Sequence, residues 1–431
     1  WIYLALLAVL ASMILYFKQG FQKSIPILVF LLPLSLSVSL SSSVSLVVPS
    51  EFLLVVIGPI VLIELYRESF KLLKQYPWPT FWLLSFIVPI VASEMLTVSL
   101  KFFFINALYL LTFYYGIILW QKKGGEFKRL VLAFSLGVFP VLVLGLINYA
   151  RYDFNPITIS GIYEPFFYSH TFFGACMALI SAYCLGKISS DKLWWLPAIV
   201  FGLAAFLSGS RAALWSMLFM LSLWALLQLG PRLRLALPLL VISLALALGG
   251  LQKIEDSFSY NKLQSYDPKA SLVEKSMSVT NVQSDVSNIE RLNRWVSALR
   301  MFEERPHWGF GPGTYQFTYI PFQEKKLENR LTVRNPDYPP EGSGGTAHSE
   351  ILLQISENGW PSTLLFLIIL ARWFYLGFWP PSHQRKLILP LFLGLATYYF
   401  HMHFNNFLNQ PAFAFLFWSF GAMLEQQYKV D

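Results

Sequence analysis

Long apolar segments recur along this chain and alternate with short polar stretches. Most of them have about 17 to 25 residues, the length that an α-helix needs to cross a bilayer. The pattern predicts an all-α, polytopic helical membrane protein with about 12 to 14 transmembrane helices. The apolar segments lie near residues 1–17, 25–40, 52–66, 79–95, 102–121, 127–148, 168–186, 193–208, 211–228, 233–250, 349–376, 386–402 and 410–427.

Composition supports this interpretation. Of 431 residues, 55% are hydrophobic and only 13% are charged, whereas soluble domains have about 25% charged residues. The net charge of +8 is explained by topology-setting lysines and arginines and by a site for an anionic substrate, not by nucleic acid. The chain starts at Trp1, so we expect a trimmed N-terminus with room for one more helix.

Lysines and arginines concentrate in every second loop, as at Lys122, Lys123 and Arg129. Because cytoplasmic loops are enriched in basic residues, the remaining loops are predicted to face the other side of the membrane. The only large hydrophilic segment, 251–347, falls on that side. We therefore expect a transmembrane bundle over 1–250, a large periplasmic loop subdomain over 251–347 with helical content near 289–302, and further transmembrane helices over 348–431.

The subdomain contains a candidate anion site. Arg291, Arg294 and Trp295 are spaced i, i+3 and i+4, so they share one face of a helix. Guanidinium groups bind phosphate bidentately, and this face shows no obvious acidic partner for the two arginines. Arg300 lies on the opposite side, where it is expected to pair with Glu304. The alternative is an ordinary solvated helix face.

A second basic site is predicted at the turn S-G-S-R, residues 208–211. Arg211 begins a membrane helix, and a helix N-terminus already favours anions. The alternative is an arginine that snorkels to the membrane surface. Lys101, in another outer loop, is expected to add charge to the same cavity.

Histidines occur at several predicted outer helix ends. His348 precedes a membrane helix and follows the glycine-rich stretch 341–346, and its ordinary pKa suits a general base near neutral pH. Glu350 is expected to cap that helix or to orient His348, with capping favoured. His170 is a further candidate. His401 and His403 are separated by about 200° on a helix, so only one can face a site; His403 is expected to line it with Asn405, Asn406 and Asn409. The alternative for each lone histidine is a structural contact.

The combination of motifs resembles the O-antigen ligase and polymerase superfamily of bacterial membrane glycosyltransferases. The resemblance covers nearly the whole chain. It rests on S-G-S-R at 208–211, R-L-x-x-W at 291–295, P-x-x-G-x-G-P-G at 306–313 and H-S-E-x-L-L-Q-x-x-x-E-x-G at 348–359. Family members usually have an asparagine where this chain has Ser349.

The resemblance implies a C-type glycosyltransferase fold and a metal-independent, inverting reaction without a cofactor. The donor would be a glycan on polyprenyl (undecaprenyl) diphosphate, and the acceptor the lipid A core or a lipid-linked glycan. The enzyme would lie in the bacterial inner membrane with its active site facing the periplasm. His348 would activate the acceptor, with Arg211 and Arg291 on the diphosphate. The substrate-binding set would be Arg294, Trp295, His170, Lys101, Glu350 and His403.

Three other functions fit part of the pattern. An O-antigen or exopolysaccharide polymerase would use the same donor with a different acceptor. A transporter of lipid-linked oligosaccharides would also be polytopic, but transporters typically show internal repeats, and we find none in the sequence. A peptidoglycan-polymerising glycosyltransferase is expected to carry a catalytic acid in its outer loop.

Overall fold

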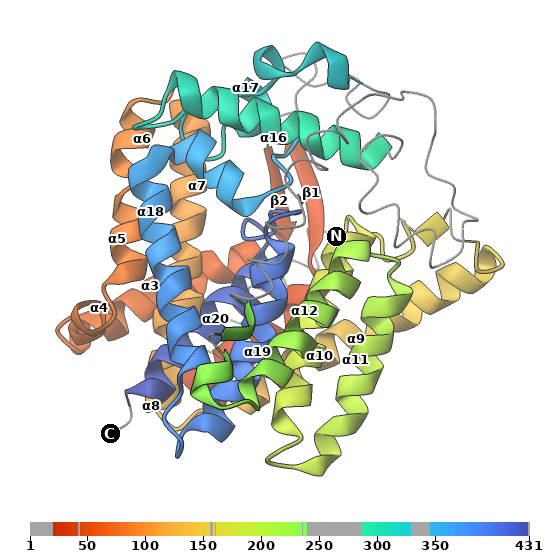
Figure 1. Ribbon diagram of the computed structural model, residues 1–431. Coiled ribbons are helices and arrows are strands. Elements are labelled where there is room, and N and C mark those ends of the chain that lie inside the picture. Colours follow the sequence, from red (N-terminus) through yellow and green to blue (C-terminus); the bar gives the residue numbers. More distant parts are fainter. Residues whose placement is uncertain are drawn as a thin grey trace.

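The computed structural model describes residues 20–41, 44–155, 158–159, 161–234, 236–238, 286–328 and 345–429. The apolar segments predicted at 1–17 and over most of 233–250 lie outside these residues, as does most of the predicted subdomain 251–347. Figure 1 shows the described part as a bundle of helices with one helix, α16 (Val286–Glu304), lying across one end.

The described part of the chain is all-α apart from one hairpin, in line with the predicted fold class. The helices of the bundle follow the predicted apolar segments closely, because uninterrupted apolar sequence satisfies its backbone hydrogen bonds internally when it is helical. They are α2 (Phe21–Leu31), α3 (Ser50–Arg67), α4 (Lys71–Gln75), α5 (Trp78–Leu84), α6 (Ile87–Val91), α7 (Leu96–Tyr109), α8 (Gly116–Lys122), α9 (Phe127–Arg151), α10 (His170–Lys187), α11 (Trp195–Leu207), α12 (Arg211–Leu227), α18 (Glu350–Phe378), α19 (Arg385–His401) and α20 (Pro411–Tyr428).

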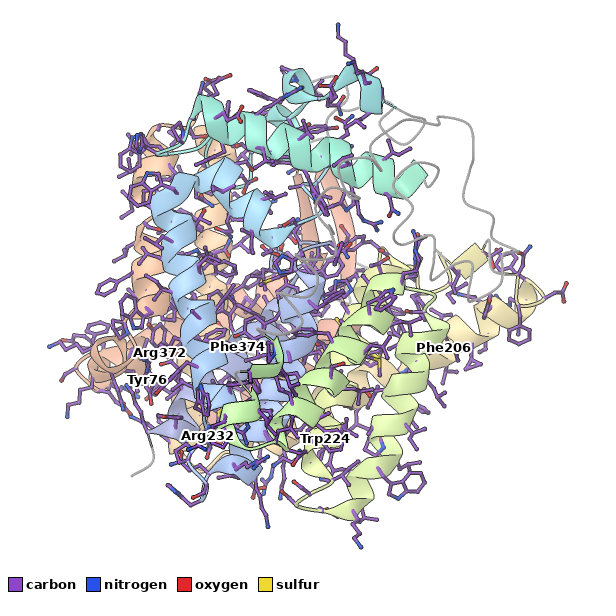
Figure 2. The ribbon with its side chains drawn as sticks, viewed as in Figure 1. Tyr76, Phe206, Trp224, Arg232, Arg372 and Phe374 are labelled. Atoms are coloured by element: carbon purple, nitrogen blue, oxygen red, sulfur yellow. The ribbon has the colours of Figure 1, made fainter. Side chains whose placement is uncertain are left out.

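Within the described residues, three helices are long and apolar enough to cross a membrane: Leu96–Lys122, Phe127–Arg151 and Glu350–Phe378. The first consists of α7 and α8 joined by the π-helical turn Leu110–Tyr115. Four shorter helices are also apolar. Large apolar side chains on the outer helices are exposed, including Phe206 on α11 and Trp224 on α12 (Figure 2). An apolar surface of this kind suits contact with lipid, so the chain is a polytopic helical membrane protein.

The transmembrane segment predicted near 25–40 is wrong in its second half. After α2 and the short 3-10 turn Leu32–Leu34, the chain forms the antiparallel strands β1 (Leu36–Ser41) and β2 (Val44–Val48). The sequence here alternates serine with valine or leucine, a period of two that favours a strand over a helix. The hairpin therefore occupies the end of the bundle near α16 (Figure 1).

Two helices form the centre of the core. α10 is buried along most of its length and packs against α11, α12 and α19. α20 is buried equally thoroughly, and its aromatic residues pack against those of neighbouring helices, as Trp418 does against Trp82 and Trp373. The end of the bundle that α16 covers brings together the first residues of α10, α12 and α18 and the last residues of α19.

Candidate active site

A small apolar cluster fixes α16 over the bundle. Ala298 and Met301 of α16 pack with Phe310, Tyr315 and Tyr319 from the following segment and with Ala347 and Leu353 around the start of α18. Asn293 adds a hydrogen bond, because its Oδ1 accepts from the Glu324 backbone N–H at 2.8 Å. The side of α16 that carries Asn293 is therefore committed to packing on residues 322–324. The face that carries Arg294, Ala298 and Met301 is turned toward the start of α18.

Arg300 belongs to the packing side, but its partners differ from the prediction. Its Nη1 donates to the carbonyls of Phe322 and Gln323, each at 3.2 Å, and its Nη2 donates to the Glu324 carboxylate. Pairing with Glu304 was wrong, since Glu304 instead lies 3.9 Å from the Nε of Arg305. Arg300 thus ties α16 to residues 322–324.

The glycine run after α16 holds a break in α18. Gly359 has a left-handed φ of 70°, so the helix is interrupted there and carbonyls before it lose their helical donors. The backbone N–H groups of Phe310 and Gly311 donate to the carbonyls of Ser356 and Glu357, at 3.1 and 2.8 Å. The two backbones approach so closely that a Cβ on Gly309 would lie 2.4 Å from Glu357. This close contact explains why the motif at 306–313 has glycine at position 309 and the motif at 348–359 ends in glycine.

Glu357 strengthens the same junction. Its buried carboxylate accepts from the backbone N–H of Gly313 and of Tyr315, each at 2.9 Å. A buried carboxylate is tolerated when its oxygens are hydrogen-bonded. The first turns of α18 and the segment after α16 are therefore joined into one rigid unit, with His348 at its edge.

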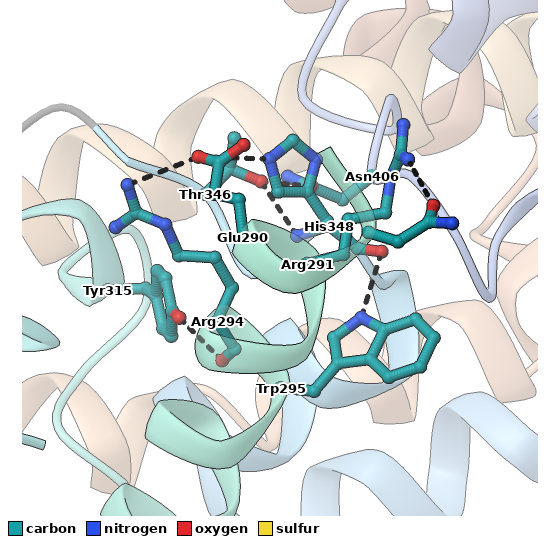
Figure 3. Close-up of polar contacts among 9 residues, drawn as sticks. Glu290, Arg291, Arg294, Trp295, Tyr315, Thr346, His348 and Asn406 are labelled. Carbon is teal, nitrogen blue, oxygen red and sulfur yellow. Dashed lines mark hydrogen bonds and ion pairs between the residues drawn. The ribbon is translucent and has the colours of Figure 1, made fainter. Parts of the chain in front are cut away.

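The backbone of His348 is held at its N–H and at its carbonyl. Its φ is 49°, an uncommon conformation for a residue other than glycine. The backbone N–H donates to Thr346 Oγ1 at 3.2 Å, and Thr346 Oγ1 in turn donates to Asn406. The Trp295 indole donates to the His348 carbonyl at 3.4 Å. Trp295, predicted to bind substrate, therefore contacts the backbone of the histidine (Figure 3).

Glu290 lies between His348 and Arg294. Its Oε1 is 3.9 Å from the Nε2 of His348 and 3.5 Å from the Nη2 of Arg294 (Figure 3). The prediction that Arg294 has no acidic partner on its face was wrong, because Glu290 is four residues earlier on the same helix. That i, i+4 spacing in N-I-E-R-L-N-R was the signal that sequence reasoning missed.

Arg294 is buried and only partly satisfied. Its guanidinium carbon lies 4.0 Å from the ring centre of Tyr319, a cation–π contact. Its Nε and Nη1 are buried without a hydrogen-bond partner among the described residues. Gly345 allows the guanidinium this place, since a Cβ there would lie 2.0 Å from Nη1. Donors of this kind can accept an anionic ligand.

Arg291 is a charged residue that acts on three histidines of the site. Its Nη1 donates to Asn288 Oδ1 at 3.5 Å, and its charge acts on His170, His348 and His401. His170 and Arg291 are thus brought together with His348, although they come from different elements. His401 is buried and lies within reach of the Arg291 charge, whereas His403, the predicted member of the pair, is exposed.

The environment of His348 favours the neutral imidazole. Burial lowers its pKa, the facing Glu290 carboxylate opposes this, and Arg291 and Arg294 lower the pKa further, so the net value lies below the ordinary 6.5. For Glu290, burial acts to raise the pKa, but His348, Arg294 and Arg291 outweigh it, so the pKa is lowered. The site therefore contains a neutral imidazole beside an ionised carboxylate and two guanidinium groups.

Glu350 is not the cap of α18. Ser349 is the N-cap, and its Oγ accepts from the Leu352 backbone N–H at 3.4 Å. The buried Glu350 carboxylate instead accepts from Tyr398 Oη at 2.7 Å and from the Leu408 backbone N–H at 3.4 Å. Glu350 therefore joins α18 to α19 and to the segment that carries Asn406.

Arg211 and Lys101 come from two other helices. Arg211 is the first residue of α12, and Ser210 caps that helix by accepting from the Ala213 backbone N–H at 3.2 Å. Lys101 is on α7, where its charge acts on Glu51 near the β-hairpin. The charged groups that act on His348 are Glu290, Arg291 and Arg294. The structure thus places Lys101 beside the hairpin.

Comparison with known families gives one match. Residues 196–367 match a family model described as O-antigen ligase, while a search of curated proteins found no match. The matched region runs from α11 through α16 into α18, so it includes Arg211, the α16 site and His348. The resemblance of the chain to the O-antigen ligase and polymerase superfamily is therefore confirmed over this region.

Proposed function

We propose that this protein transfers a glycan from a polyprenyl-diphosphate donor to a hydroxyl of the lipid A core, on the periplasmic side of the inner membrane. The observation that carries the proposal is the cluster of His348, Arg291 and Arg294 at one end of the bundle. It combines a neutral base with two guanidinium groups, which suits proton removal next to an anionic leaving group.

The reaction follows from these groups. The acceptor hydroxyl oxygen attacks the anomeric carbon while its proton passes to His348. The bond between the anomeric carbon and the diphosphate oxygen breaks, and polyprenyl diphosphate leaves with its negative charge facing Arg291 and Arg294. Direct attack inverts the anomeric configuration. In this proposal the arginines carry out the charge neutralisation that a metal ion performs in other transferases.

Arg211 is proposed as a further ligand of the donor diphosphate. It adds a full positive charge at the N-terminus of α12, where backbone N–H groups already favour an anion. Ser210 occupies only one of these N–H groups as an acceptor. α12 packs against α10, which begins at His170, so Arg211 lies at the same end of the bundle as the histidine cluster.

A transfer assay tests the proposal. Purified protein is incubated with lipid-linked glycan and lipid A core, and the glycosylated product is separated on a gel. His348→Gln should reduce transfer by about 100-fold or more, because general-base catalysis contributes at least that much. His383→Gln, an exposed histidine between α18 and α19, is the matched control. Transfer by His348→Gln at the wild-type rate would exclude His348 as the base.

Deletion in the native host separates ligase from polymerase. Unmodified lipid A core, with long polymer left on the carrier, is expected for a ligase. Lipid A core capped with a single repeat would instead indicate a polymerase and would contradict the proposed acceptor. Surface glycans are compared on a gel with those of the complemented strain.

The proposed side of the membrane is tested by cysteine labelling. Glu303→Cys places a thiol on the exposed side of α16, and Glu126→Cys places one just before α9, at the opposite end of the bundle. The native Cys176 and Cys184 are buried. In intact spheroplasts a membrane-impermeant maleimide should label position 303 only, and labelling of position 126 alone would reverse the orientation.

A further inference from the structure

We propose that Glu290 is a positioning residue that holds the Nε2–H of His348, so that Nδ1 is the nitrogen that accepts the proton. This inference rests on the proposed function of His348. A neutral imidazole has one donor nitrogen and one acceptor nitrogen, and the group facing the donor decides which is which. Oε1 of Glu290 lies 3.9 Å from Nε2, so the carboxylate faces that nitrogen.

Glu290 is itself held from the opposite side. Arg294, one turn further along α16, lies 3.5 Å from the same Oε1. Arg294 cannot swing away easily, because its side chain is only 6% exposed and its guanidinium stacks on Tyr319. The Tyr315 hydroxyl donates to the Arg294 carbonyl at 2.8 Å, which fixes the helix at this point. The carboxylate is therefore restrained by a buried cation.

The backbone of His348 is fixed, but its ring is not fixed by the backbone contacts. Thr346 and Trp295 hold the N–H and carbonyl of the residue, which leaves the side-chain torsions to determine where the imidazole points. Among the described side chains, Glu290 is the charged group that attracts the ring. Removing it leaves the base present but free to rotate.

Charge balance gives Glu290 a second effect. Arg291 and Arg294 of α16 both act on His348, and Arg291 also acts on His170 and His401 from α10 and α19. From the segment 402–410, the neutral Asn406 accepts a hydrogen bond from Thr346, which in turn accepts one from the His348 backbone N–H. When His348 takes the proton it becomes an imidazolium beside two guanidinium groups, and Glu290 is the acidic partner that offsets this repulsion.

The proton balance is simple. The proton moves from the acceptor oxygen to Nδ1, the new glycosidic bond forms, and the bond to the diphosphate breaks. The Nε2–H stays with His348 and Glu290 stays ionised throughout, as the carboxylate of a catalytic triad does. Loss of the Nδ1 proton to water restores the enzyme.

Glu290→Gln tests the proposal, with Glu303→Gln as the matched control. Glu303 is exposed on the same helix and lies about 20 Å from Glu290 along the axis. The chain has six histidines, so ¹³C-labelled histidine in detergent micelles gives few signals, and loss of one in His348→Gln assigns that residue. The His348 titration is read by NMR, and transfer is measured against pH with donor and acceptor saturating.

Two changes are expected together in Glu290→Gln. The His348 titration and the acidic limb of the rate profile both move to lower pH, because the carboxylate that favours the imidazolium is gone. The maximal rate falls roughly tenfold or more, since a rotated base loses part of its contribution, while the donor KM changes little. Glu303→Gln should leave the titration and the rate as in the wild type.

A purely structural role is distinguishable. It would lower the melting temperature and the rate at every pH without moving the His348 titration, and that result would overturn the proposal. If Glu290→Gln does not fold, Arg294→Gln removes the opposite charge and should move the titration to higher pH; an unmoved titration there would also overturn it. If the His348 titration moves in Glu290→Gln but the wild-type protein itself transfers no glycan, the proposed function is overturned while the Glu290–His348 pairing stands.

Discussion

The two faces of α16 carry the same residue type in opposite situations. On the packing face, Arg300 donates to two carbonyls and a carboxylate. On the site face, Arg294 shares one carboxylate oxygen with His348 and has Nε and Nη1 buried without a partner among the described residues. The first arginine is bonded through both of its Nη groups, and the second, among the residues that the structure describes, through Nη2 alone.

The difference separates stability from function. A charged group whose donors are satisfied stabilises the fold, and an incompletely satisfied one costs free energy until something binds. Arg300 is therefore interpreted as a structural tie between α16 and residues 322–324. Arg294, with Arg291 beside it, is interpreted as a preorganised anion site, since its cost is offset when a diphosphate arrives.

The largest loss of transfer is expected when the arginines of the site face are removed. Arg291→Ala and Arg294→Ala should each lower transfer by about 100-fold or more, because each removes positive charge near the leaving diphosphate. Arg291→Lys should rescue only partly, since an ammonium cannot make the bidentate contact. Transfer is measured on purified protein with donor binding as a second readout, and a larger loss in Arg300→Ala would reverse the assignment of the two faces.

A smaller effect is expected when Arg294 is displaced rather than removed. In Gly345→Ala the new Cβ would lie 2.0 Å from Nη1, so the end of the Arg294 side chain must move. The donor KM should rise about tenfold, the equivalent of one weakened charged hydrogen bond, with little change in melting temperature. Gly230→Ala is the control, because nothing lies within 4 Å of a Cβ there; equal KM values in both variants would contradict the Arg294 site.

The pH dependence sharpens the site-face side of the comparison. The base must be neutral, and the pKa of His348 lies below the ordinary 6.5 through burial, partly opposed by Glu290. Half-maximal transfer is therefore expected at a pH below 6.5, because the imidazole is protonated only as the pH falls through its lowered pKa. A rate profile at saturating substrate checks this, and half-maximal transfer above 6.5 would mean that another group limits the reaction.

The smallest effect on chemistry is expected at Arg300. Arg300→Ala should change the maximal rate by no more than about twofold, since the residue lies off the site face, but should destabilise the protein by about 1 to 2 kcal/mol through lost hydrogen bonds. Thermal melts and transfer rates measured on the same preparation separate the two. An unchanged melting temperature would remove the structural role of Arg300.

Much of the fold can be predicted from the sequence, because a membrane helix forms its backbone hydrogen bonds within itself and is recognised as a long apolar segment. The hairpin at 36–48 was misread, since its apolar content resembles a span and only the period of two distinguishes it. The break at Gly359 was also missed, because it depends on donors from Phe310 and Gly311, far away in sequence.

The site was predicted in part. Helical spacing correctly grouped Arg291, Arg294 and Trp295, and topology placed them near His348. The pairing of Glu290 with Arg294 follows from their i, i+4 spacing on α16. Other features depend on tertiary contacts: helical spacing separates His401 from His403 but does not say which faces inward, and the partners of Arg300 and Glu350 come from distant segments.

The interruption of α18 at Gly359 has a consequence for building hybrid enzymes. Residues before it are bonded to the segment after α16, and residues after it continue into the bundle. Exchanging the outer part between relatives at the first residue of α18 would separate His348 from the turns that align it with Glu290. A junction placed at Gly359 would keep the histidine, its carboxylate and both arginines together as one module.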